Sequence, residues 1–392
     1  MLKVLIVAGS YPYPEHRDGL AKINANLLVT NSSFRADMLC VQDVDYPEPP
    51  MSAFYKMPAL PALSRAAQAG AYLFSSMPIG LVRLAPYFDS FSRFIINNHH
   101  RYDVIHLSSA YMAGLVRHLP PEVIAKTILF PIDSVSLFWA RRRDAEQGFL
   151  KRQLYGEELL RNRRLERELY PLFRKAVFVS DVDARHAQKL APRAHCTSIP
   201  NGVDIAYFHP MSVQRTASIV FTGDMSYAPN RDAAYFLLDE ILPRIPPELA
   251  PHVYLVGQRP CKRLQSLNMK GLTVTGFVDD LRPYLAEAAA YVSPLRFGSG
   301  IKNKVLEAMA MGQVVVGTPV SFEGIACKSG KHCISTTTTP DDFAAALTEV
   351  LRDRAAFEPM GAQARALVEQ EYSWDSIRKA YGKLYESCAA HR

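Results

Sequence analysis

The chain is poor in cysteine and contains no long apolar run, and each shortage excludes certain classes of protein. Its 392 residues include six cysteines, none of them in a Cys-x-x-Cys pair. A disulfide framework or a zinc site is therefore not expected, and a reducing cytoplasm fits better. The longest uncharged stretch, 66–82, holds 17 residues and is interrupted by Gly70, Pro78 and Gly80. A membrane-spanning helix needs about 20 apolar residues, so we expect attachment to one membrane face at most.

No secretion signal is expected at the start of the chain, because 3–9 is too short for a signal core and is typical of a buried strand. Hydrophobic residues make up 48% and charged residues 21% of the chain, which excludes a disordered protein. The net charge of +7 is compatible with anionic substrates, a membrane surface or nucleic acid.

The excess positive charge is concentrated in one segment. Residues 141–175 contain eleven basic and six acidic side chains. A solvated helix face is the ordinary interpretation of such a run. The functional alternative is a patch for anionic lipid head groups or a lipid-diphosphate acceptor, with the apolar segment 57–95 as a further contact.

Two series of short apolar runs indicate two domains of the α/β class. The runs are 4–7, 38–41, 103–107, 127–130 and 176–180, then 218–222, 252–256, 272–275, 290–293 and 314–317. Such runs, separated by helix-length segments, predict doubly wound parallel sheets that bind ligands beyond the carboxyl ends of their strands. Pro200-Asn201-Gly202 places a linker near 200–215. We expect an acceptor domain over 1–205, a donor domain over 206–370 and a final helix, 371–392, that packs back on the first domain.

The most informative motif follows the run 290–293. Gly298 and Gly300 predict a loop in which the backbone approaches an anion closely. A helix then begins near Lys302 and Lys304, where a cation is unfavourable unless an anion is bound. Glu307 follows one turn later and could accept hydrogen bonds from ribose hydroxyls. An ordinary loop with solvated lysines is the alternative to a nucleotide-diphosphate site.

This segment resembles the donor-site signature of family 4 glycosyltransferases, which have the GT-B fold. Glu307-Ala308-Met309-Ala310 matches the second glutamate of their motif, whereas Ser299 stands in place of the first. The chain is most similar to bacterial exopolysaccharide-type sugar transferases with the pattern Gly-x-Gly-x-x-x-Lys-x-Leu-Glu-Ala, in which Lys304 would meet the diphosphate. The resemblance implies two Rossmann-like domains facing each other across a cleft.

Other donor-binding residues are implied by the same resemblance. They are Gly223 and Asp224 after the first strand of the second domain, Gly257 after the next strand, and Phe277 and Val278, whose main chain would read the base. In the first domain the loop with Arg17 and Gly19 would approach the phosphate and the sugar. A solvated Arg17 is the alternative.

Two further residues are catalytic candidates, with Lys304, in the acceptor domain. His106 lies in the run 103–107, where the family often has His-x-His, and Asp133 follows the run 127–130. A carboxylate at that edge could bind sugar hydroxyls or accept the proton of the acceptor. A buried histidine and a helix N-cap are the alternatives.

The sequence therefore predicts transfer of a sugar from a nucleotide-diphosphate sugar to a hydroxyl group of a glycan, a glycolipid or a small molecule. UDP is the expected nucleotide. The resemblance implies retention of configuration. No metal is expected, because Asp181-Val-Asp183 has the form of a metal clamp but begins a predicted helix. Nucleic acid is not an expected partner, because basic motifs interleaved with aromatic residues are lacking, and no cofactor is expected. A nucleotide-sugar 2-epimerase and a non-enzymatic polyanion-binding protein are the alternatives.

Overall fold

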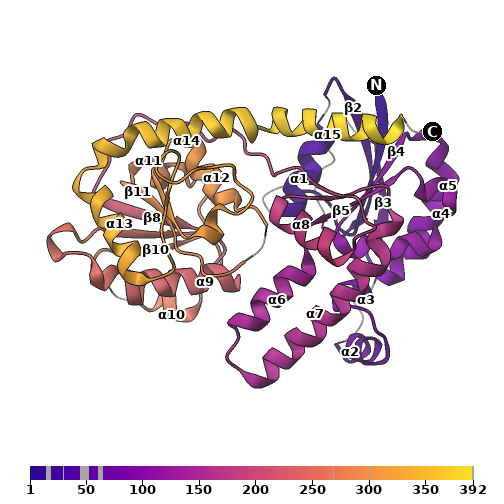
Figure 1. Ribbon diagram of the computed structural model, residues 1–392, viewed down its shortest axis with the longest axis horizontal. Helices are drawn as coiled ribbons and strands as arrows, with labels where there is room; N and C mark the ends of the chain where they lie inside the picture. Colours follow the sequence, from indigo (N-terminus) through magenta and orange to yellow (C-terminus); the bar gives the residue numbers. More distant parts are fainter. Residues whose placement is uncertain are drawn as a thin grey trace. The chain divides into compact units, whose positions relative to one another are not determined.

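The computed structural model describes residues 1–14, 19–29, 31–44, 53–60, 65–267, 269–298 and 300–390. Contacts divide the chain into two compact units (Figure 1). Unit 1 is formed by Met1–Pro200 together with the residues from Ile377 onward, and unit 2 is Asn201–Ser376. None of the described helices is both long and apolar enough to cross a bilayer.

Unit 1 is built on a seven-stranded parallel sheet in the order β3-β2-β1-β4-β5-β6-β7. The strands are β1 Leu2–Ala8, β2 Phe34–Gln42, β3 Phe54–Pro58, β4 Val104–Ser108, β5 Thr127–Ile132, β6 Ala176–Phe178 and β7 Cys196–Ser198. The helices are α1 Gly19–Leu28, α2 Arg65–Phe74, α3 Ile79–Leu84, α4 Phe88–Asn98, α5 Pro121–Ile124, α6 Val135–Ala145, α7 Phe149–Leu169 and α8 Asp181–Leu190.

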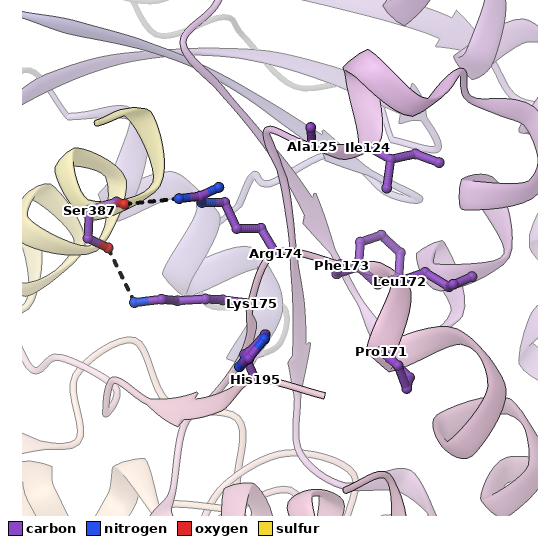
Figure 2. Close-up of a pocket in the computed structure, with 9 residues that line it drawn as sticks. All are labelled: Ile124, Ala125, Pro171, Leu172, Phe173, Arg174, Lys175, His195 and Ser387. Atoms are coloured by element: carbon purple, nitrogen blue, oxygen red, sulfur yellow. Dashed lines mark hydrogen bonds between the residues drawn. The ribbon is translucent and has the colours of Figure 1, made fainter. Parts of the chain in front are cut away.

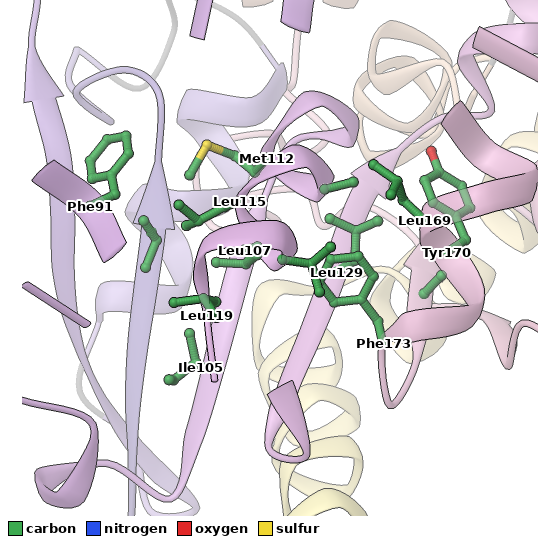
Figure 3. Close-up of a cluster of buried hydrophobic side chains, with 14 of the residues drawn as sticks. Phe91, Ile105, Leu107, Met112, Leu115, Leu119, Leu129, Leu169, Tyr170 and Phe173 are labelled. Atoms are coloured by element: carbon green, nitrogen blue, oxygen red, sulfur yellow. The ribbon is translucent and has the colours of Figure 1, made fainter. Parts of the chain in front are cut away.

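The sheet of unit 1 is covered on both faces, because nearly every residue of its central strands β1, β4 and β5 is buried. In β1, Leu5 and Val7 point into a large core, while Val4 and Ile6 are fully buried on the other face. Figure 3 shows the core on the first of these faces, with side chains from β4 and β5 beside Phe91 of α4. The prediction of a doubly wound parallel sheet is confirmed for this unit.

Unit 2 contains a six-stranded parallel sheet in the order β10-β9-β8-β11-β12-β13. Its strands are β8 Ser218–Thr222, β9 His252–Val256, β10 Leu272–Gly276, β11 Ala290–Ser293, β12 Val315–Gly317 and β13 Ile334–Ser335. Its helices are α9 Ala228–Tyr235, α10 Lys262–Gln265, α11 Arg282–Glu287, α12 Asn303–Ala310, α13 Pro340–Arg352 and α14 Glu358–Glu371.

The last helix, α15 (Trp374–Ala389), belongs to both units. Its start is fixed in unit 2, where the Val203 N–H donates to the Tyr372 carbonyl at 2.8 Å. The remainder belongs to unit 1, where Tyr381 and Tyr385 are buried. The predicted helix after Tyr372-Ser373-Trp374 is confirmed. All ten predicted strands are also confirmed; β3, β7 and β13 were missed, and each lies at a sheet edge.

Candidate functional site

The carboxyl ends of β8 and β9 come very close together in unit 2. A Cβ on Gly257 would lie 1.9 Å from the Gly223 carbonyl oxygen, and one on Gly223 would lie 2.7 Å from the Asn230 side chain. The Gly223 N–H donates to the Val256 carbonyl at 2.9 Å, and that of Gly257 donates to the Gly276 carbonyl at 3.1 Å. Glycine is therefore required at Gly257 by the backbone of Gly223, and at Gly223 by its φ of 154° and the Asn230 side chain. Both N–H groups are engaged within the sheet.

The bend before α12 has the predicted form. Gly298 and Gly300 have φ of 146° and 64°. Gly312 follows the helix with φ of 68° and forms the left-handed cap that glycine after the motif Glu307-Ala308-Met309-Ala310 favours. Lys302 is the residue at the N-cap position and is buried, and its ammonium donates to the Gly300 carbonyl at 2.5 Å. The first N–H groups of a helix have no partner within the helix, so this bend and its two lysines can bind an anion.

Lys304 joins this bend to the end of β8. Its ammonium donates to the Asn230 side-chain oxygen and lies 4.5 Å from the centre of the Phe221 ring. The Asn230 amide in turn donates to the Asp224 carbonyl at 2.9 Å. Burial of the ammonium and the neighbouring Lys302 lower the pKa of Lys304 to about 7, against the opposing effect of Glu307. A bound anion would relieve this burial cost.

The rim of this site is charged and more accessible. Asp224 forms an ion pair with Arg259. Burial raises the pKa of Asp224, but hydrogen bonds from Arg259 and Ser226 outweigh burial and hold it below its usual range. Phe277 is exposed and Val278 is half-buried, directly after β10. Unit 2 thus places Gly223, Asp224, Gly257, Lys302, Lys304 and Glu307 on the strand ends or the adjoining helix, as expected from the sequence.

Two further candidates, Arg17 and Ser299, are outside the described residues. Gly19 is exposed at the first position of α1, with open space around its Cα.

His106 is a core residue of unit 1. It is completely buried, its Nδ1 lies 2.7 Å from the Tyr385 hydroxyl, and the rings of Phe130 and Tyr381 pack against it. Burial lowers the pKa of His106 to about 3, so the ring is neutral at physiological pH. This environment favours the buried, hydrogen-bonded histidine over a group that meets a substrate.

Asp133 lies at the carboxyl edge of the sheet, directly after β5. The preceding residue, Ile132, has φ of 74°, which is unusual for a β-branched side chain. The N-cap alternative for Asp133 is wrong, because Ser134 is the N-cap of α6 and its hydroxyl accepts from the Leu137 N–H.

A buried polar cluster, which the sequence did not reveal, holds the residues after Asp133. The Ser136 N–H and hydroxyl donate to Glu166 at 3.0 and 2.6 Å, and the Ser134 N–H donates to Asp183 at 2.9 Å. Burial raises the pKa of Glu166 to about 7, although hydrogen bonds from Ser136 and Ser134 oppose this. The two carboxylates fix the segment that carries Asp133. Asp183 belongs to the first turn of α8, which confirms that Asp181-Val-Asp183 begins a helix.

A hollow of about 640 Å³ lies at the amino ends of the strands of this sheet, opposite the end where Asp133 lies (Figure 2). Arg174 and Lys175 precede β6 and point toward Ser387 of α15, with distances of 3.5 Å from Arg174 Nη2 to the Ser387 carbonyl and 3.2 Å from Lys175 Nζ to its hydroxyl. Cations near the last carbonyls of a helix stabilise it. This hollow therefore marks where α15 is fixed to unit 1. Among the described residues no group of three metal-ligating side chains occurs.

Comparison with known proteins gives the following similarities. Residues 216–353 match the family model for group 1 glycosyl transferases. The sucrose-phosphate synthase of Thermosynechococcus elongatus superposes with a TM-score of 0.77 at 15% identity and full coverage of both chains. HepE of Anabaena, solved in complex with UDP, has a TM-score of 0.69 at 14% identity, over 98% of this chain and all of the other. WaaG, from lipopolysaccharide biosynthesis, has 0.64 at 16% identity, over 97% and 99%. No curated protein matches the chain in sequence.

Proposed function

We propose that this chain, a glycosyltransferase with the GT-B fold whose residues 216–353 match the group 1 glycosyl transferases, transfers a sugar from a UDP-sugar to a hydroxyl group. Unit 2 would bind the donor and unit 1 the acceptor, which would be a glycan, a glycolipid or a small molecule. The similar HepE structures hold UDP or UDP-glucose, which supports UDP as the nucleotide.

The observation that carries this proposal is the pair of lysines at the start of α12. Lys302 is buried and the Lys304 ammonium is enclosed. Two neighbouring cations in such a place are costly. Glu307 offsets part of that cost for Lys304, and an anion bound between the glycine bend and the helix would offset more of it. A diphosphate has the charge and the size to fill that role.

The same groups can stabilise the transition state. When the bond between the anomeric carbon and the diphosphate oxygen breaks, negative charge develops on the leaving diphosphate. Protonated Lys304, Lys302 and the first N–H groups of α12 would stabilise this charge. Because the protein supplies these cations, we propose that transfer needs neither a metal ion nor a cofactor. Glu307, one turn further along, would accept hydrogen bonds from the ribose.

On the acceptor side we assign Asp133 the role of orienting the attacking hydroxyl. Its neighbours Ser134 and Ser136 are held by Asp183 and Glu166, so its position is defined. With retention of configuration, the acceptor oxygen forms the new bond on the face that the diphosphate leaves, and the acceptor proton passes to the departing oxygen.

The test is Lys304→Ala and Glu307→Ala, assayed for UDP binding by calorimetry and for donor consumption, with Lys270→Ala as the control. Lys270 is an exposed lysine of unit 2. We expect UDP affinity to fall at least tenfold for Lys304→Ala and to be unchanged for Lys270→Ala, and transfer to persist in excess EDTA. Normal turnover in both site variants would refute the donor site. Donor consumption without any acceptor would instead favour the epimerase.

A further inference from the structure

The helical hairpin formed by α6 and α7 differs from the other helices of unit 1. Figure 1 shows it extending away from the sheet of that unit. Ser136 is the only residue of α6 that is buried, and all residues from Phe149 to Leu154, the first six of α7, are exposed. The hairpin end therefore does not cover the core, and its apolar side chains require another explanation.

Large apolar side chains are concentrated at this end. Phe149, Leu150 and Leu154 are 72%, 77% and 61% exposed. At 3.6 residues per turn, Leu150 and Leu154 share one face of α7 with Arg161, about 17 Å from Leu150 along the helix. Exposed large apolar side chains that gather on one surface usually mark an interaction site.

Helix α2 extends the same face. The Arg161 guanidinium donates to the Tyr72 and Ser75 carbonyls at 2.7 and 2.9 Å, which fixes the end of α2 against α7. The two residues at that end, Leu73 and Phe74, are 71% and 94% exposed. We call these five side chains the apolar stripe: Leu73, Phe74, Phe149, Leu150 and Leu154.

Basic and aromatic groups flank the stripe. Arg142 stacks on Tyr155 and Trp139, with its guanidinium carbon 4.7 and 5.4 Å from the two ring centres. Lys151 and Arg152 are exposed. Within the described ranges, no ion pair involves these three cations. Between positions 141 and 152 the chain has five basic and two acidic side chains.

We propose that the apolar stripe and its flanking cations dock unit 1 on an anionic lipid surface. Apolar side chains that enter the boundary of the acyl chains, cations at the level of the head groups, and Trp and Tyr between them form the pattern by which helices lie on membranes. A neutral protein partner would not require the surplus of cations, whereas a bilayer containing anionic lipid complements them. The docking is independent of donor binding, so it can fail while the proposed function holds.

The test is vesicle flotation with the full chain, using phosphatidylcholine alone and phosphatidylcholine with 30% phosphatidylglycerol. We expect binding to the anionic vesicles only, weakened by salt. Phe149→Ser with Leu150→Ser should reduce the partition constant at least tenfold. Lys151→Gln with Arg152→Gln should reduce it by about tenfold or more, since each cation near such a surface contributes about fivefold.

The matched control is Leu172→Ser, which removes a half-exposed leucine of unit 1 outside the stripe. It should leave vesicle binding unchanged, and UDP binding should be unchanged in every variant. Equal binding to both vesicle types, no binding, or the same loss with Leu172→Ser would overturn the proposal. Dimers that disappear with Phe149→Ser and Leu150→Ser, without vesicle binding, would assign the stripe to a second copy of the chain.

Discussion

Glu166 of unit 1 is buried and Lys304 of unit 2 is half-buried with an enclosed ammonium, and the pKa values of both are moved to about 7, from opposite directions. Their surroundings differ. Glu166 accepts hydrogen bonds from the Ser136 N–H and hydroxyl and from the Ser134 hydroxyl. Lys304 faces an amide oxygen, an aromatic ring and a second lysine, and only the charge of Glu307 favours its protonated form. Both groups have a like charge nearby, Asp183 for Glu166 and Lys302 for Lys304. The donors of Ser134 and Ser136 compensate the charge of Glu166 within the protein, which makes it part of the framework, whereas the charge of Lys304 is compensated less and indicates a binding site.

The largest expected difference between Glu166 and Lys304 is in their effect on stability. We expect Glu166→Ala to lower the free energy of unfolding by about 3 kcal/mol, because it leaves the donors of Ser134 and Ser136 buried without an acceptor. Lys304→Met, which keeps the length of the side chain and removes the charge, should leave that free energy unchanged or raise it by about 1 kcal/mol. Urea unfolding of each variant measures both values. A larger loss for Lys304→Met than for Glu166→Ala would reverse the assignment of the two roles.

The two groups should also give opposite dependence of stability on pH. The pKa of Glu166 is raised on folding, so its contribution is present at pH 4.5 and is lost as the pH rises toward 7. The pKa of Lys304 is lowered on folding, so the unfolded state binds the extra proton between pH 7 and about 10, and stability increases with pH there. Each effect should amount to about 2–4 kcal/mol.

Urea unfolding from pH 5 to 9 measures this difference, with Glu166→Gln and Lys304→Met as the variants without these titrations. UDP binding sharpens it further. A bound diphosphate favours the charged form of Lys304. We therefore expect UDP affinity to decrease as the pH rises above 7, where the lysine of the free protein loses its proton. Below pH 8, the number of protons taken up on UDP binding should fall as the pH falls, because the lysine is then already protonated. Lys304→Met should abolish the decrease in affinity. An affinity that rises above pH 7 would contradict the role of Lys304.

The sequence allowed the strands and the lysines to be predicted because both are local signals. Most interior strands are apolar runs, whereas of the missed edge strands Cys196–Ser198 is short and partly polar and Phe54–Pro58 is interrupted by Lys56 and ends in proline. Lys304 follows directly from the glycine bend. The partners of these groups could not be found in this way, because Asn230 lies 74 positions from Lys304 and Glu166 lies 30 from Ser136. Such contacts follow only from the order of the strands.

The smallest expected effect concerns Gly312 and compares the two ends of α12 in stability and in UDP affinity. Gly312, after the helix, has φ of 68°, and a Cβ there would lie 3.4 Å from Pro210. Gly312→Ala should therefore lower the free energy of unfolding by about 1 kcal/mol. UDP affinity should remain within twofold, since the anion would bind at the other end of the helix. Urea unfolding and calorimetry on the same preparation measure both quantities. A loss of affinity as large as that of Lys304→Ala would mean that α12 as a whole, and not the charge at its first turn, determines binding.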